Sequence, residues 1–159
     1  MNIIKADLSD STQAADFILL MSLYARDPMG GGADLSAQIK ADLPAALAAR
    51  DHCISFIAYV DDKPAGLLTA MEGFSTFACK PLLNIHDVIV NPGFRGRNIA
   101  GHLLETAQKE AIARGCVKLT LEVLQGNDAA RKVYRRYGFA PYVLDAQMGC
   151  AEFWQKQLG

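Results

Sequence analysis

The chain has no surplus of charge of either sign and no long apolar run. Its 159 residues include 16 Lys and Arg against 17 Asp and Glu, a formal net charge of −1. It therefore lacks the basic excess that nucleic-acid or anionic-membrane binding usually needs. No run of about 18 uncharged apolar residues occurs, and no basic segment leads into an apolar one after Met1. We expect a soluble cytoplasmic protein with no nucleic-acid and no membrane partner.

The spacing of cysteine and histidine matches no common metal site. The four cysteines are far apart with no CxxC pair, and the three histidines form neither HxxxH nor HExxH. Structural zinc sites usually draw their ligands from such closely spaced pairs. We therefore expect no bound metal, and reduced, mostly buried thiols at Cys53, Cys79, Cys116 and Cys150.

What the chain does contain is enough apolar material for a core. Hydrophobic residues make up 51% of the sequence and charged residues 21%, which is typical of a globular domain. No segment resembles a linker long enough to divide it. We expect a single domain over residues 1–159.

Hydrophobic periodicity and turn residues predict an α/β fold with helices on the faces of a sheet. Helices are expected at about 10–25, 35–49, 99–113 and 128–137, the third being the most clearly amphipathic. Gly115 and Gly138 stand where two of them should end. Strands are expected at about 2–6, 54–60, 65–72, 82–90, 117–124, 139–143 and 148–155.

A first candidate site follows the predicted strand 82–90 and opens the predicted helix 99–113. It reads Arg95-Gly96-Arg97-Asn98-Ile99-Ala100-Gly101. A glycine-containing turn at a helix N-terminus presents free N–H groups and the positive end of the helix dipole, a combination that binds pyrophosphate. The segment is neither a Walker loop nor GxGxxG. Taken alone, it fits a helix start with two solvated arginines equally well.

A second candidate begins where the predicted strand 117–124 ends. Asn127 stands at the N-cap of the helix 128–137, and Tyr134 lies two turns along it. The Asn127 side chain could cap the helix or bond an amide-bearing ligand. Taken alone, the segment favours a capped surface helix whose tyrosines cover the sheet.

In this order and at this separation, the two segments resemble the GNAT superfamily of acyl-CoA-dependent N-acyltransferases. The family pattern Arg/Gln-x-x-Gly-x-Gly/Ala falls on Arg95, Asn98 and Ala100. The pattern Asn-x-x-Ala-x-x-x-Tyr-x-x-x-Gly-Phe falls on Asn127, Ala130, Tyr134, Gly138 and Phe139. Asn98 replaces the usual glycine, and Asn is the non-glycine residue best able to adopt positive φ. We expect the turn to survive, with weaker or repositioned cofactor binding.

The resemblance implies the GNAT fold, a central mixed, mostly antiparallel, splayed sheet of about seven strands flanked by about four helices. It implies acetyl-CoA as co-substrate. The splay would lie between the strand 82–90 and the strand ending at Leu124. Cofactor binding would involve the backbone of Val88, Ile89 and Val90 at the pantetheine arm, the loop and helix start Arg95, Gly96, Arg97, Asn98, Ile99, Ala100 and Gly101, and Asn127, Ala130 and Tyr134.

The resemblance also implies catalytic roles. Tyr134 would be the acid, because a phenol with a pKa of about 10 keeps its proton at neutral pH and can protonate the departing thiolate. A backbone N–H near Val88 would stabilise the oxyanion. His86 and Glu122 are the candidate bases, although a buried strand histidine and a solvated glutamate explain them as well. Simple alternation puts Asp87 opposite His86, where it would anchor a loop or helix end.

The expected reaction is transfer of an acetyl group to a primary amine, favoured to be that of a small molecule. Protein N-termini or lysines are the alternative acceptors, and a non-catalytic acyl-CoA-binding module is the alternative function. Acidic residues suited to a cationic acceptor are Glu72, Glu122, Asp27 and Asp34, and the loop Asp27 to Gly32 would form one wall of the acceptor site. Phe153 and Trp154 fit a homodimer contact or the end of the core.

Overall fold

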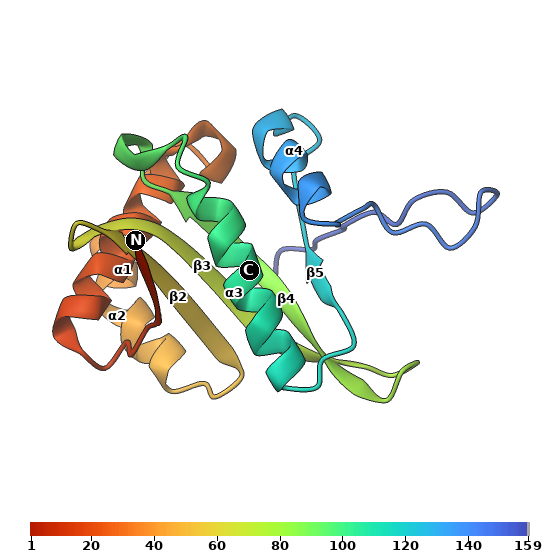
Figure 1. The fold of residues 1–159 in the computed structure, drawn as a ribbon, viewed down its shortest axis with the longest axis horizontal. Coiled ribbons are helices and arrows are strands. Elements are labelled where there is room, and N and C mark those ends of the chain that lie inside the picture. The colour runs from red at the N-terminus through yellow and green to blue at the C-terminus, as the bar shows by residue number, and fades with distance from the viewer. Residues whose placement is uncertain (159) are drawn as a thin grey trace. The chain divides into compact units, whose positions relative to one another are not determined.

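The computed structural model describes residues 1–158, and the chain forms two compact parts, Met1–Leu121 and the residues from Glu122 onward. The first part contains, in chain order, β1 (Asn2–Lys5), α1 (Ser11–Arg26), the 3₁₀ turn η1 (Pro28–Gly30), α2 (Ala37–Ala48), β2 (Cys53–Val60), β3 (Lys63–Ser75), β4 (Lys80–Val90), the 3₁₀ turn η2 (Pro92–Phe94), α3 (Ile99–Ala113) and β5 (Leu119–Leu121) (Figure 1). The second part contains α4 (Asp128–Arg136).

The five strands form one sheet in the order β1-β2-β3-β4-β5. Neighbours from β1 to β4 are antiparallel, and β4 and β5 are parallel. The sheet is therefore mixed and mostly antiparallel, as predicted. The β2–β3 turn is tight because Asp61 and Asp62 both adopt positive φ, 51° and 57°, a backbone that short-chain polar residues tolerate.

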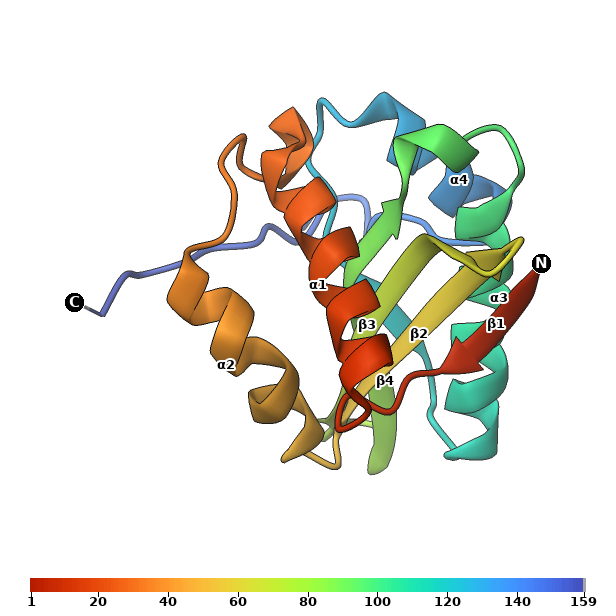
Figure 2. The ribbon, with the colours of Figure 1, turned by 90° about the vertical axis from the view of Figure 1, so that its left-hand side faces the viewer.

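Helices cover both faces of this sheet. On one face lies α1 (Figure 2), and its Phe17 and Leu20 pack with Ile57, Leu67 and Ile89 of the sheet. We call this the α1 face, and α2 packs on it through Leu43 and Leu47. The opposite face carries α3, whose Leu103 and Leu104 are fully buried, and we call it the α3 face. No helix in residues 1–158 is long and apolar enough to span a membrane.

The expected strand count is wrong. Five strands form in residues 1–158 rather than about seven, and β5 ends at Leu121 instead of Leu124. The segments 139–143 and 148–155 form no strand, and the only bridge between them joins Val143 to Cys150. A strand-like sequence forms a sheet only where its apolar side chains find a surface to cover, and Val143, Met148 and Trp154 are exposed.

Two other expectations about apolar residues also need correction. Phe153 is 68% and Trp154 83% exposed, so neither completes a core. Cys79 and Cys150 are exposed, whereas Cys53 and Cys116 are partly buried. Thiols are therefore not mostly buried, because half of them lie on turns or in the C-terminal segment rather than in packed elements.

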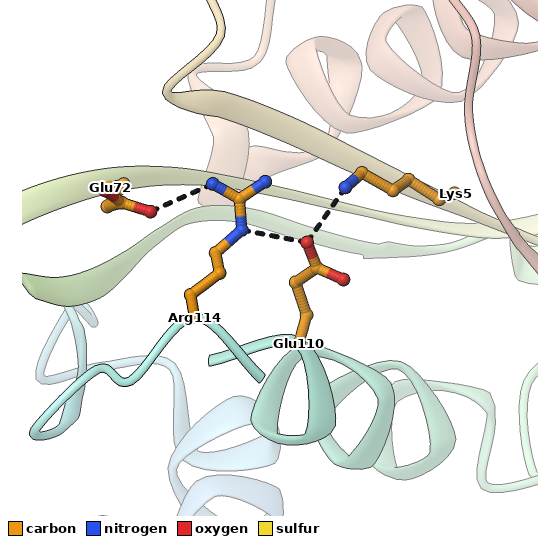
Figure 3. A network of polar contacts seen from close by, with 4 residues as sticks. All are labelled: Lys5, Glu72, Glu110 and Arg114. Atoms are coloured by element: carbon orange, nitrogen blue, oxygen red, sulfur yellow. Dashed lines mark hydrogen bonds and ion pairs between the residues drawn. The ribbon is translucent and has the colours of Figure 1, made fainter. Parts of the chain in front are cut away.

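A network of four charged side chains ties α3 to β1 and β3 (Figure 3). Glu110 Oε1 accepts hydrogen bonds from Lys5 Nζ and from Arg114 Nε, each at 2.8 Å. Arg114 also donates to Glu72 Oε2 at 2.9 Å. Glu72 therefore lies on the α3 face and is held by Arg114. It does not join Asp27 and Asp34, two other acidic acceptor candidates, which lie after α1.

Substituting Glu110→Gln tests this network through its pH dependence. The hydrogen bond from Lys5, followed by that from Arg114, holds the pKa of the Glu110 carboxyl below its usual value. The stabilisation is thus complete above the unfolded pKa of about 4.3 and is lost as pH falls through the lower folded pKa. Lys5 is half exposed, so solvent screens the ion pair. We therefore expect Glu110→Gln to lower the free energy of unfolding by about 0.5 kcal/mol at pH 7.

Denaturant unfolding at pH 7 and at pH 3 measures the effect. The free energy of unfolding should differ between the wild type and Glu110→Gln at pH 7 and converge at low pH. Asp51→Asn, which removes a carboxylate from the exposed turn before β2, should change neither value. A deficit of equal size at both pH values would mean that packing, not charge, explains it.

Candidate active site

The loop between β4 and α3 has the backbone that its sequence predicts. Gly96 adopts a φ of 81° and Asn98 a φ of 55°, so asparagine fills the left-handed position where glycine is usual. The His102 N–H donates to the Asn98 carbonyl at 3.2 Å and closes the first turn of α3. The first N–H groups of an α-helix have no partner within the helix, so residues 99–101 place donors at its positive end.

The two arginines of this loop have different surroundings. Arg97 lies over the ring of Phe94, 5.6 Å from its centroid, a cation–π distance. Arg95 reaches across to the segment after α1, where its Nη2 lies 3.3 Å from Asp27 Oδ2. Arg95 is 61% exposed, so its guanidinium remains open to a phosphate-bearing ligand.

The strand leading into this loop has one bare edge. β4 pairs with β5 only over Leu83–Ile85, whereas its ladder with β3 continues to Val90 opposite Gly66. Within residues 1–121, Val88, Ile89 and Val90 therefore have a strand on one side only. An unpaired strand edge offers alternating N–H and C=O groups, which an extended amide-bearing ligand can pair with.

A β-bulge at His86 changes which side chains line the α1 face. Thr69 pairs with Asp87 and Ala70 with Ile85, so His86 is the extra residue. Asp87 and Ile89 are two residues apart on the strand, and Ile89 packs in the α1-face core. Asp87 therefore points to the α1 face. The expectation that Asp87 lies opposite His86 is wrong, because a bulge breaks the two-residue alternation.

His86 itself lies beside polar side chains of the same face. Its Nε2 is 3.3 Å from Asn84 Nδ2, and the Thr120 hydroxyl donates to Asn84 Oδ1 at 3.0 Å. Asn84 pairs with Met71 in the ladder, which places it on the α1 face. The imidazole is exposed. His86 is therefore accessible on the face that also holds Asp87.

Tyr24 is a candidate that the sequence reasoning missed, and Asp87 is one that it assigned to anchoring a loop or helix end. Burial raises the pKa of the Asp87 carboxyl, against a smaller lowering by His86. Burial likewise raises the pKa of the Tyr24 phenol, with further contributions from Asp87 and then Asp27. These groups therefore share one electrostatic environment. The signal in the sequence was a lone carboxylate inside the apolar run around Asp87.

The segment after α1 is a structured turn. The Asp27 N–H donates to the Tyr24 carbonyl at 2.9 Å, and the Asp27 carboxylate accepts from the Met29 N–H at 2.9 Å. Gly30 presses against α1, where a Cβ would overlap the Tyr24 carbonyl. Gly31 and Gly32 both adopt positive φ. These glycines form a tight corner of the chain.

The remaining candidates belong to the second part of the chain. Asn127 caps α4 by accepting from the Ala130 N–H at 3.1 Å, as expected. Tyr134 is half-buried, and its ring meets Phe139 edge-on with centroids 6.0 Å apart. Glu122 is exposed and lies beyond the end of β5. The predicted site residues are thus divided between the two parts of the chain.

A model of the acetyltransferase (GNAT) family matches residues 19–139, most of the chain. The chain belongs to the GNAT family. GNAT acetyltransferases take their acetyl group from acetyl-CoA. Because this chain belongs to the family, it is an N-acetyltransferase.

Solved structures share this GNAT fold. AAC(6')-Iy in complex with the bisubstrate analogue CoA-S-monomethyl-acetylneamine is 19% identical, with a TM-score of 0.76 over 99% of this chain and 98% of that one. The aminoglycoside acetyltransferase meta-AAC0020 from an uncultured soil metagenomic sample, in complex with sisomicin, is 17% identical, with a TM-score of 0.78 over 98% and 95%. Ribosomal-protein-alanine N-acetyltransferase from Brucella melitensis biovar Abortus 2308 is 20% identical, with a TM-score of 0.68 over 91% and 98%.

Proposed function

We propose that the protein transfers an acetyl group from acetyl-CoA directly to a primary amine of a small molecule. One observation carries the proposal: the bare edge of β4 runs into a left-handed turn and then into the N-terminus of α3. An extended amide chain ending in a pyrophosphate matches that sequence of donors and acceptors.

In this proposal, acetyl-CoA lies along one continuous stretch of backbone. The pantetheine amides pair with Val88 to Val90, and the pyrophosphate binds the N–H groups of the loop 95–101. Arg95 supplies a charge-assisted contact. Asn127, Ala130 and Tyr134 of the second part are the remaining proposed cofactor-binding residues, because they match the family pattern.

The chemistry needs three groups. The neutral amine nitrogen attacks the thioester carbonyl carbon, and a backbone N–H near Val88 stabilises the oxyanion that forms. The C–S bond then breaks, and the departing sulfur receives the phenol proton of Tyr134. The proton that the amine loses passes to His86, directly or through water, or to Glu122. His86 is favoured because it is exposed beside Asn84 on the α1 face.

A cationic acceptor suits the α1 side of the sheet. Asp87 lies there, and Asp27 stands on the loop proposed as the acceptor wall. Two of the similar structures are aminoglycoside acetyltransferases, one of them in complex with sisomicin. The similarity to a ribosomal-protein-alanine N-acetyltransferase supports the alternative, a protein acceptor.

The test is acetyl-CoA-dependent thiol release against polyamines, aminoglycosides, amino acids and short peptides. We expect turnover with at least one cationic small amine and none without an amine. Turnover only with peptides would mean that the acceptor is a protein amine and not a small molecule. Silence across the panel would contradict the proposed transfer.

Three further expectations accompany this function: a cytoplasmic location, one domain spanning the chain, and a homodimer formed through the apolar C-terminal segment. Support for the dimer comes from the exposure of Phe153 and Trp154, since exposed apolar patches commonly mark protein contacts.

A further inference from the structure

The contact between Arg95 and Asp27 joins two segments with different proposed tasks. The residues are 68 positions apart in the chain. One belongs to the loop proposed to bind pyrophosphate and the other to the turn proposed as the acceptor wall. Both arise within residues 1–121, so the fold itself brings them together.

Asp27 is the fixed member of this pair. Its carboxylate accepts from the Met29 N–H, its N–H donates to the Tyr24 carbonyl, and its carbonyl accepts from the Gly30 N–H at 2.8 Å and the Gly32 N–H at 3.1 Å. Arg95 is the movable member, because its long side chain is mostly exposed. The guanidinium can therefore leave while the carboxylate stays in place.

Resting on the proposed function, we propose that Arg95 is a counterion shared between Asp27 and the cofactor. Without cofactor it neutralises Asp27. When the pyrophosphate binds, the guanidinium turns to that stronger anion, and Asp27 is left as an uncovered carboxylate. Asp27 then recognises the ammonium of a cationic acceptor as a positioning residue, not as the base.

The sharing predicts effects of opposite sign on the two substrates. Removing the charge of Asp27 frees Arg95 for the pyrophosphate and should tighten CoA binding. The same change removes an anion from the acceptor site and should weaken binding of the amine. If the role of Asp27 were purely structural, the change would weaken binding of both CoA and the amine. Linkage also requires CoA and the acceptor to strengthen each other's binding in the wild type.

Calorimetric titration with CoA at low salt tests the cofactor half. Asp27→Asn keeps the oxygen that caps Met29 and removes only the charge. We expect it to tighten CoA binding about two- to fivefold, the range of an exposed ion pair. Arg95→Ala should lower the affinity for CoA about tenfold. The double variant with Asp27→Asn should bind CoA as Arg95→Ala does. Asp42→Asn, an equal loss of charge on α2, should match the wild type.

The outcomes separate the inference from the function it rests on. A wild type that fails to bind CoA would overturn the proposed function. A wild type that binds CoA, with Asp27→Asn unchanged or weaker, would overturn the shared counterion alone. For the amine that the thiol-release panel identifies, Asp27→Asn should raise KM about three- to tenfold with kcat within about twofold. An unchanged KM would overturn the acceptor half.

Discussion

Replacing Tyr134 with phenylalanine should lower the turnover number about 100-fold, while CoA affinity stays within about threefold. The phenol is the group proposed to protonate the departing sulfur. Phenylalanine keeps the ring that meets Phe139 edge-on. The substitution therefore removes the proton donor without emptying the space it fills.

Thiol-release kinetics and CoA titration on the same preparation separate these two effects. Tyr137→Phe is the matched control, because it removes a phenol from the C-terminal end of the same helix, and it should keep wild-type turnover. Equal turnover of Tyr134→Phe and the wild type would remove Tyr134 from the acid role. A fall in CoA affinity as large as the fall in turnover would assign it to binding instead.

Replacing Gly66 with valine should lower the free energy of unfolding by about 3 kcal/mol, the upper end for overpacking. Gly66 lies on β3 where α3 approaches closely. A Cβ there would come within 2.7 Å of Ile99 Cγ2, 3.0 Å of the Ile89 carbonyl oxygen and 3.1 Å of Leu103 Cδ1. Two of these neighbours are buried α3 side chains and the third is backbone, so none can give way easily.

The same substitution should weaken CoA binding, because Ile99 is the first residue of α3. Pushing Ile99 away from β3 moves the N–H groups proposed to hold the pyrophosphate. Gly73→Val is the control on the same strand, since the nearest atom there, Leu82 Cδ1, lies 3.4 Å from a Cβ. Denaturant unfolding and CoA titration measure both effects. Equal losses in the two variants would contradict the α3 contact as their cause.

The sequence predicted the features that depend on local chemistry. The helix from Ile99, the cap at Asn127 and the positive φ of Asn98 each follow from residues within a few positions of one another. The motif order also indicated the family correctly. Local rules work here because capping and left-handed turns are determined by short-range hydrogen bonds and sterics.

The features that the sequence missed depend on distant partners. Whether 139–143 and 148–155 become strands depends on a surface to pair with, which no local pattern reports. The bulge at His86 reassigns Asp87 to the α1 face, and a two-residue alternation gives no sign of it. Likewise, Arg114 pairs with Glu72, 42 positions away in the sequence. Arg95 pairs with Asp27, 68 positions away. Such pairings are visible only once the chain is folded.

Amide hydrogen exchange with and without CoA tests the central claim most directly, because the claim concerns which backbone groups the cofactor touches. The account predicts that CoA slows exchange in residues 86–101, along the bare edge of β4 and the start of α3, and in the segment around Asn127 and Tyr134. Residues 56–59 of β2, which pair with β1 on one side and with β3 on the other, should not respond. CoA binding that leaves 86–101 unprotected would contradict the account.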